Sequence, residues 1–274
     1  MHFHFGLIGY PIKHSLSPFI HDQFLERSGL EGKYSIIEID PKSNFKESIS
    51  ALKRMKLDGF NITVPFKQTI LNHLDELDET VIDIQAVNTV LCKDNRWIGY
   101  NTDGIGYALS LEEKYPIIKN NKSVNILIIG AGGAAKGIYH GLRKKGYHSI
   151  TIANRTVEKA EVIATRKHVL TLEDAEKNLE KFDVIIQTTS VGMKPNINDK
   201  ILSLGNIKSD TIVSDIVYQP IMTQFLKEAK ECGARIHNGH TMLLYQAKYA
   251  FEIWTNKEPD ISGLDALLEN KLEG

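Results

Sequence analysis

In the segment NITVPFK, Lys67 follows closely after an expected strand. Its ammonium group makes it the first candidate for a catalytic or binding residue. Proline has no backbone N–H and restricts the residue before it to extended geometry, so strand pairing is expected to stop at Val64. A new helix can then begin. Lys67 is thereby expected at the carboxyl end of a strand, where open α/β sheets bind ligands. The alternative is a solvated lysine.

Two further polar residues have both a chemical and a structural interpretation. Asp103 lies in YNTDGIGYALSL, which resembles a helix start, and aspartate is a favoured N-cap residue. Gln246 lies on a helix face that is otherwise apolar, formed by Met242, Ala250 and Ile253. Its amide therefore needs a hydrogen-bond partner, which a ligand or a buried structural contact would supply.

A glycine loop follows the apolar strand VNILII and opens a helix. Glycines in this context allow a tight turn and let a pyrophosphate approach the free N–H groups of the helix N-terminus. The loop departs from the usual fingerprint by an alanine in place of the third glycine, which the fingerprint tolerates. The residues expected to hold the phosphates of a dinucleotide are Gly130, Ala131, Gly132, Gly133, Ala134 and Ala135.

The end of the next strand indicates which dinucleotide is bound. An NAD site usually has an acidic residue there for the ribose 2′-hydroxyl, whereas this strand ends in Asn154, Arg155 and Thr156. Arg155 can pair with a 2′-phosphate through charge-assisted bonds worth roughly 1.5–3 kcal/mol, so NADP is the expected cofactor. A solvated surface arginine is the alternative.

The elements that must position these residues alternate between strands and helices. In the first hundred residues, FHFGLIG, KYSIIEI and GFNITV are expected strands, with helices from about Pro18 and through FKESISALKRM. This alternation predicts βαβ units and a mostly parallel sheet. Ser17 is expected as the N-cap before Pro18, which puts the preceding serine in a loop. AVNTVLCK and RWIGYNT are expected to form an edge hairpin around the turn DN.

A second α/β run begins at the glycine loop. Its expected strands are VNILII, SITIANR, DVIIQTTS and TIVSDIVY, which are typical of one open dinucleotide-binding sheet. The last long helix, TMLLYQAKYAFEIW, lies beyond this sheet and is expected to fold back onto the first domain.

Length and charge narrow the function further. The chain has 274 residues, enough for two domains, and a net charge of -1 with acids and bases interspersed. This charge distribution lacks the basic surface typical of a nucleic-acid-binding protein, and it favours a small-molecule partner. With no secretory signal and no run of ~20 apolar residues, no membrane association and a cytoplasmic protein are expected. Cys92 and Cys232 stand apart without metal-ligand spacing, so no metal is expected.

The motifs together resemble those of the shikimate dehydrogenases, in order and over nearly the whole chain. The matching segments are GYPIKHSLSPFIHD, GFNITVPFK, AVNTV, GYNTDGIG, GAGGAAKG, NRT, TTSVGM and YQAKYAFEIW. The resemblance implies reversible NADPH-dependent reduction of 3-dehydroshikimate to shikimate, on the pathway to chorismate and the aromatic amino acids. It also implies an α/β fold with a substrate domain, residues 1–103 plus 239–274, a Rossmann-like NADP domain, residues 104–238, and an active-site cleft between them.

The resemblance assigns roles to individual side chains. Lys67 and Asp103 would be the catalytic pair, with Lys67 stabilising the charge that grows on the substrate oxygen and supplying its proton. Asp103 would orient Lys67 and hold the neighbouring hydroxyl. The remaining substrate contacts would come from Ser15 and Ser17, on the carboxylate, and from Thr63, Asn88, Tyr218 and Gln246, on the ring and hydroxyls.

On the cofactor side, Thr188, Thr189, Ile216 and Gly239 would lie along the rest of the dinucleotide. The sequence departs from the family at His240 and Thr241, which replace a glycine-rich approach to the last helix. It also departs after Tyr218, in YQPIMTQFL.

Other functions remain open from the sequence. A quinate/shikimate dehydrogenase that uses NAD would share Lys67 and Asp103. Two features disfavour it, namely Arg155 and the second serine of SLS, Ser17, which stands in place of a threonine. A non-catalytic regulator that binds shikimate or NADP would have no need of both residues in intact motifs. A module using only the dinucleotide-binding half would leave the first hundred residues unexplained. A monomer and a homodimer are equally compatible with the sequence.

Overall fold

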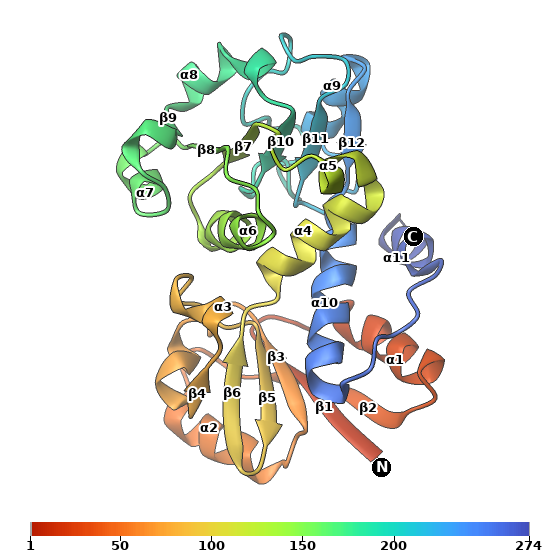
Figure 1. The fold of residues 1–274 in the computed structure, drawn as a ribbon. Coiled ribbons are helices and arrows are strands. Elements are labelled where there is room, and N and C mark those ends of the chain that lie inside the picture. Colours follow the sequence, from red (N-terminus) through yellow and green to blue (C-terminus); the bar gives the residue numbers. More distant parts are fainter. Residues whose placement is uncertain (1, 274) are drawn as a thin grey trace. The chain divides into compact units, whose positions relative to one another are not determined.

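The computed structural model describes residues 2–273, which divide into two compact units (Figure 1). The first unit contains residues 2–102 and Gln246–Ser262, and the second contains Asp103–Tyr245 and residues 263–273. This division differs from the expected domains at the C-terminus. Helix α10 (Gly239–Thr255) is shared by both units, and α11 (Leu264–Glu273) belongs with the second.

The first unit is built on a mixed sheet with strand order β2-β1-β3-β5-β6-β4. Its strands are β1 (His2–Gly9), β2 (Glu31–Glu38), β3 (Gly59–Ile62), β4 (Glu76–Leu77), β5 (Thr89–Lys93) and β6 (Arg96–Tyr100). β1 pairs in parallel with both β2 and β3, as the βαβ alternation predicts, whereas β5 runs antiparallel to β3 and to β6.

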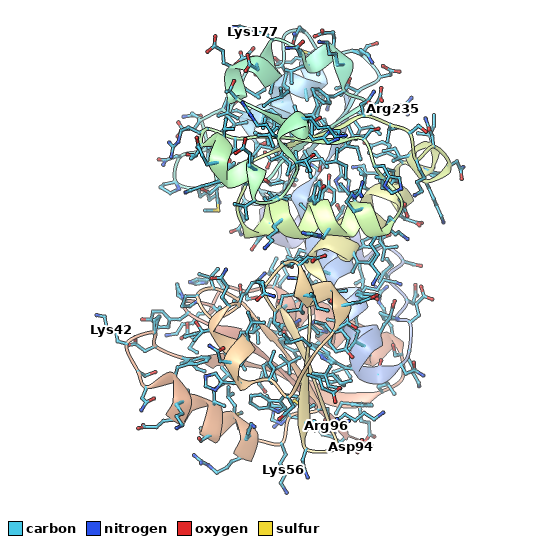
Figure 2. The ribbon with its side chains drawn as sticks, turned by 60° about the vertical axis from the view of Figure 1, so that its left-hand side comes forward. Lys42, Lys56, Asp94, Arg96, Lys177 and Arg235 are labelled. Atoms are coloured by element: carbon cyan, nitrogen blue, oxygen red, sulfur yellow. The ribbon has the colours of Figure 1, made fainter. Side chains whose placement is uncertain are left out.

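The predicted hairpin around DN is confirmed. Lys93 pairs with Arg96, and the two turn residues Asp94 and Asn95 have φ of 52° and 59°, the left-handed geometry that two-residue hairpin turns require. Figure 2 shows Asp94 and Arg96 pointing outward at this end of the sheet. The short β4, not the hairpin, forms the edge of the sheet.

Each face of this sheet is covered by helices. Phe5 of β1 packs with Phe251 and Trp254 of α10 and lies on the face near α1 (Ser17–Arg27). The approach is so close that a Cβ added at Gly59 would lie 2.4 Å from the Trp254 ring. The other face carries a second cluster in which Ile8 packs with residues of α2 (Phe45–Arg54).

One predicted helix boundary is wrong. Leu16, not Ser17, occupies the N-cap of α1, and Ser17 is the first helical residue. The physical reason is that the hydroxyl of Ser15 accepts the hydrogen bond from the Ser17 N–H at 3.2 Å, so the serine two residues earlier satisfies this free donor.

The second unit has the strand order β12-β11-β10-β7-β8-β9, the doubly wound order of dinucleotide-binding folds. Its strands are β7 (Ile126–Ile129), β8 (Ile150–Ala153), β9 (Val169–Leu170), β10 (Val184–Gln187), β11 (Ile212–Asp215) and β12 (Arg235–His237). Every pair is parallel, which confirms the predicted open sheet. The strand order reverses between β7 and β10, where such sheets bind their ligands.

Two layers of helices cover this sheet. On one face, α4 (Asp103–Lys114) crosses α6 (Gly133–Lys144) so closely that a Cβ on Gly104 would lie 1.9 Å from the backbone oxygen of Gly137. The opposite face carries the cluster to which α8 (Leu172–Glu176) and α9 (Gln224–Glu231) contribute. The shorter helices are α3 (Glu79–Ile82), α5 (Pro116–Asn120) and α7 (Val157–Glu161), with 3-10 turns at Thr69–His73, Arg166–His168 and Leu179–Lys181.

Two kinds of feature are absent from residues 2–273. No helix in that range is both long and apolar enough to cross a membrane. Within the same range, no group of three or more His, Cys, Asp or Glu side chains is arranged to hold a metal ion.

Candidate active site

Lys67 lies in the turn that follows β3, with its side chain half-buried. The turn is held from both sides. Phe66 is buried and stacks on Phe45 with ring centroids 4.7 Å apart, and the Lys67 carbonyl accepts a hydrogen bond from the Val87 N–H at 2.8 Å. The backbone that carries Lys67 is therefore fixed next to the segment that carries Asn88.

Asn88 is buried at the start of β5, in a network made of side chains. Its Nδ2 donates to the Thr102 hydroxyl at 2.9 Å, and its Oδ1 accepts from the Thr102 N–H at 2.8 Å and from the Thr89 hydroxyl at 3.0 Å. Nδ2 also lies 3.5 Å from Oε1 of Gln246. The two predicted substrate amides, Asn88 and Gln246, are thus brought together.

The chain runs directly from Thr102 to Asp103, the first residue of α4. Because both the backbone and the hydroxyl of Thr102 bind Asn88, the start of α4 is tied to this network through the chain itself.

Asn61 supports the network from beneath, a role that the sequence analysis missed. Its Nδ2 donates to the Asn88 carbonyl at 3.1 Å and to the Thr89 hydroxyl at 3.0 Å, and its Oδ1 accepts from the Tyr34 hydroxyl at 2.8 Å. Burial raises the pKa of Tyr34 well above its ordinary value, so this hydroxyl keeps its proton and donates. An amide in the middle of the apolar strand GFNIT was the signal that could have revealed this role.

The serine pair lies between β1 and α1, with Ser15 in the loop and Ser17 at the helix start, and Thr63 directly follows β3. The hydroxyl of Ser15 lies 3.2 Å from that of Ser17, which is buried. Thr63 donates its N–H to the Ile8 carbonyl at 2.8 Å, and its methyl would lie 2.5 Å from a Cβ on Gly9. The loop after β1 and the loop after β3 therefore start side by side.

The glycine loop in the second unit has the shape that a pyrophosphate requires. Gly130 has φ of 114°, and a Cβ there would lie 2.6 Å from the Thr188 hydroxyl. Next to Gly132 and Gly133, by contrast, a Cβ would have nothing within 4 Å. Gly132 is the N-cap of α6 and has no side chain to cap the free N–H groups, so they are available to an anion. The residues present fit a dinucleotide.

The turn at the end of β8 presents an exposed arginine. Asn154 donates from Nδ2 to the Thr156 carbonyl at 2.7 Å, which folds the turn, and Arg155 is exposed.

A pocket of about 400 Å³ opens where β10 and β11 end. Four of its residues are among the cofactor or substrate contacts that the sequence analysis expects, and five others, including Met193 and Lys194, are not. The pocket is lined by Thr188, Thr189, Ser190, Met193, Lys194, Ile216, Val217, Tyr218 and Gln219.

Helix α10 begins with the family departures His240 and Thr241, yet Gly239 still packs closely against the backbone of Ile216. A Cβ on Gly239 would lie 2.4 Å from the Ile216 carbonyl, so this position needs glycine. The Thr241 hydroxyl contacts Nε2 of His237 at 3.0 Å and donates to the Asn238 carbonyl at 2.7 Å. Thr241 is thus accommodated by local hydrogen bonds without moving Gly239 away from the pocket wall.

Family comparisons agree with this arrangement. Residues 7–90 match the family described as shikimate dehydrogenase substrate binding domain, residues 112–216 match shikimate / quinate 5-dehydrogenase, and residues 239–268 match the shikimate 5′-dehydrogenase C-terminal domain. The three matches cover most of the chain.

Individual relatives align over nearly their full length. The shikimate dehydrogenase (NADP(+)) of Oceanobacillus iheyensis is 53% identical over 271 residues, 98% of either chain. A crystal structure of a shikimate dehydrogenase in complex with NADP+ superposes with a TM-score of 0.89 at 39% identity, covering 98% of this chain and 96% of that one. The Thermus thermophilus enzyme, solved with NADP(H) and shikimate, gives a TM-score of 0.86 at 32% identity, covering 98% of this chain and 99% of that one.

Proposed function

Because the chain belongs to the shikimate dehydrogenase family, it is an NADP-dependent oxidoreductase that interconverts 3-dehydroshikimate and shikimate, and we propose which side chains carry out that reaction. The reaction is a step of chorismate and aromatic amino-acid biosynthesis. The observation that carries the assignment of side chains is the turn that fixes Lys67 beside the Asn88 network.

Lys67 acts as the general acid in the reducing direction. The hydride for the C3 carbon comes from the nicotinamide when the cofactor is bound. As negative charge develops on the C3 oxygen, the Lys67 ammonium stabilises it and transfers a proton to it. In the oxidising direction the same nitrogen takes the proton back. Asp103 orients Lys67 and binds the adjacent substrate hydroxyl.

The other polar groups of the first unit orient the substrate. Asn88 and Gln246 present their amides to ring hydroxyls, with Asn88 held by Thr102 and Thr89 so that little side-chain freedom is lost on binding. Thr63 and Tyr218 contact the ring. Ser15 and Ser17 bind the carboxylate through their hydroxyls.

The second unit holds the cofactor. The free N–H groups of α6 bind the pyrophosphate, with the loop Gly130 to Ala135 around it. Arg155 pairs with the 2′-phosphate, and Asn154 and Thr156 shape that turn. Thr188, Thr189, Ile216 and Gly239 lie along the nicotinamide half.

The first test follows absorbance at 340 nm with purified protein, shikimate or quinate, and NADP or NAD. Fast NADP reduction with shikimate alone is the expected result. Turnover with quinate or NAD would instead identify a relaxed quinate/shikimate dehydrogenase. Binding of shikimate without turnover would identify a regulator and would contradict the catalytic roles proposed for Lys67 and Asp103.

Two further proposals concern the protein in its cell. We propose that it acts in the cytoplasm and as a monomer or homodimer. Cell fractionation tests the first proposal, and sedimentation equilibrium tests the second.

A further inference from the structure

Two polar side chains lie buried next to each other at the carboxyl ends of β10 and β11. Gln187 is 1% exposed and Asp215 is 0% exposed, and the two residues are paired in register across the parallel strands. Nε2 of Gln187 donates to Oδ1 of Asp215 at 3.2 Å. Neither residue was singled out by the sequence or assigned a role above.

Gln187 shapes the turn after β10. Its Nε2 also donates to the carbonyls of Thr189 and Val191, at 3.2 and 3.1 Å, and its Oε1 accepts from the Thr189 N–H. One amide side chain therefore contacts three backbone groups of the segment that forms the first wall of the pocket, and its two N–H hydrogens are shared between the two carbonyls and Asp215.

Asp215 shapes the turn after β11 in the same way. Its Oδ1 accepts from the Val217 N–H at 2.9 Å, and its Oδ2 accepts from the Thr223 hydroxyl at 2.7 Å. The Thr223 hydroxyl in turn caps α9 by accepting from the Leu226 N–H at 3.3 Å. Asp215 thus fixes both ends of the segment that carries Tyr218.

A buried carboxylate is a costly way to hold a loop. Burial raises the pKa of Asp215 to about 6, which records the unfavourable desolvation of its charge. Apolar residues of similar volume are often as stable as buried ionised groups, so stability alone does not account for this choice. An apolar pair would lack the directed hydrogen bonds that fix the conformation of the two turns.

We propose that Gln187 and Asp215 are positioning residues for the dehydrogenase reaction, which together hold both walls of the pocket in the geometry that receives the nicotinamide half of the cofactor. This inference deepens the proposed function and rests on it. Neither side chain is proposed to touch the reacting atoms.

The test measures NADPH and NADH dissociation constants by cofactor fluorescence, a readout that needs no turnover. In Asp215→Asn, an amide N–H₂ replaces one acceptor among groups that all donate. We expect both dissociation constants to rise by the same factor, roughly tenfold, because the displaced pocket walls lose about one hydrogen bond to the cofactor. The NADPH/NADH preference should stay unchanged, since Arg155 is untouched.

The matched control lies immediately before β11, at the end of the strand opposite to Asp215. Thr211 is 1% exposed, and its hydroxyl lies 3.4 Å from the Phe182 carbonyl, far along β11 from the pocket. Thr211→Val should lower the melting temperature with both dissociation constants within about twofold of wild type. If Asp215→Asn lowers the melting temperature but leaves cofactor binding as in this control, the positioning role is wrong.

A second pair of variants covers the case in which Asp215→Asn does not fold. Thr223→Val removes one donor to the carboxylate and keeps the charge, and it should raise both dissociation constants in the same direction by a smaller factor. Thr223→Ser restores the hydroxyl and should restore binding. Equal dissociation constants in the two Thr223 variants would overturn the proposal. Normal cofactor binding by the wild-type protein without shikimate turnover would instead count against the proposed function alone.

Discussion

The two units hold their functional groups by different means. In the first unit, Asn88 is positioned by other side chains, namely Asn61, Thr89 and Thr102. In the second, the glycine loop offers backbone N–H groups at the start of α6, and no side chain caps them. A hydroxylated ring must be recognised group by group, which requires fixed side chains, whereas a phosphate is recognised by any cluster of N–H donors.

One buried histidine of each unit shows the reverse contrast, with side-chain partners in the second unit and not in the first. His21 lies among aromatic rings, stacked on Tyr34 at 4.4 Å, and neither of its ring nitrogens has a hydrogen-bond partner within residues 2–273. His237 instead meets the hydroxyls of Ser214, Ser110 and Thr241. Burial lowers the pKa of both rings to about 3. His21 and His237 therefore have similar pKa values, although only His237 is hydrogen-bonded to neighbouring hydroxyls.

The strongest test of the side-chain site is Lys67→Ala. Removal of the proposed general acid should lower kcat by at least ~10²-fold, with a smaller effect on shikimate KM. Steady-state kinetics at 340 nm measure both constants. Lys56→Ala, which removes an exposed lysine of the same unit, is the control and should be unchanged. A near-normal rate in Lys67→Ala would remove this lysine from the mechanism.

The next largest effect is expected from the support beneath Asn88. Asn61→Leu leaves the Tyr34 hydroxyl without its acceptor. It also removes the side-chain donors to the Thr89 hydroxyl and to the Asn88 carbonyl, which keeps its bond from the Ile62 N–H. The free energy of unfolding should therefore fall by roughly 2–3 kcal/mol. Shikimate KM should rise while the NADPH dissociation constant stays constant. Tyr34→Phe removes only one bond of this set and should cost about 1 kcal/mol. A rise in the NADPH constant of Asn61→Leu would show that the two binding functions are not separately supported.

Substitution of the two histidines is expected to change stability at pH 8 in opposite directions. Each ring is neutral when folded and becomes charged on unfolding below pH 6.5, so its contribution is complete above pH 6.5 and is lost as the pH falls toward 3. At pH 5 the loss is about 2 kcal/mol for each. His21→Phe should remove this loss and also stabilise the protein at pH 8, because neither ring nitrogen has a partner at hydrogen-bond geometry and the weak favourable interaction with Asn61 is outweighed by burial.

His237→Phe should remove the same acid sensitivity yet lower stability at pH 8, by roughly 1–3 kcal/mol, since it leaves buried hydroxyls without a partner. Denaturant unfolding at pH 8 and pH 5 measures both variants. The contrast between the two sites fails if both substitutions change stability at pH 8 in the same direction.

The smallest effect is expected at the exposed Arg155. Arg155→Ala should raise KM for NADPH by about tenfold and leave KM for NADH nearly constant, since only the 2′-phosphate is lost as a partner. Kinetics with both cofactors measure the ratio. An unchanged ratio would mean that another group recognises the 2′-phosphate.

The sequence predicted those parts of the fold that depend on neighbours along the chain. The apolar runs became strands, DN became the hairpin turn, and the glycine loop opened α6. The N-cap at Ser17 failed because the Ser15 hydroxyl is a local competitor for the same N–H.

The supports of the site were out of reach for a different reason. Asn61 with Asn88, and Gln187 with Asp215, are separated by 27 and 28 residues and meet only through the register of the sheets. Periodicity and motif spacing contain no information about such pairs. Residues that stand in local motifs are thus easier to single out from the sequence than the residues that support them.

The division of α10 between the units also governs the order in which the protein can be completed during synthesis. Trp254 and Phe251, which close the aromatic face over Phe5 and Gly59, follow all of Asp103–Tyr245 in the chain. The ribosome therefore releases the sheet of the first unit long before its covering helix, although domains tend to fold from the N-terminus as they emerge. The unit that is translated first is the one that must wait, with an apolar surface exposed, until the second has been made.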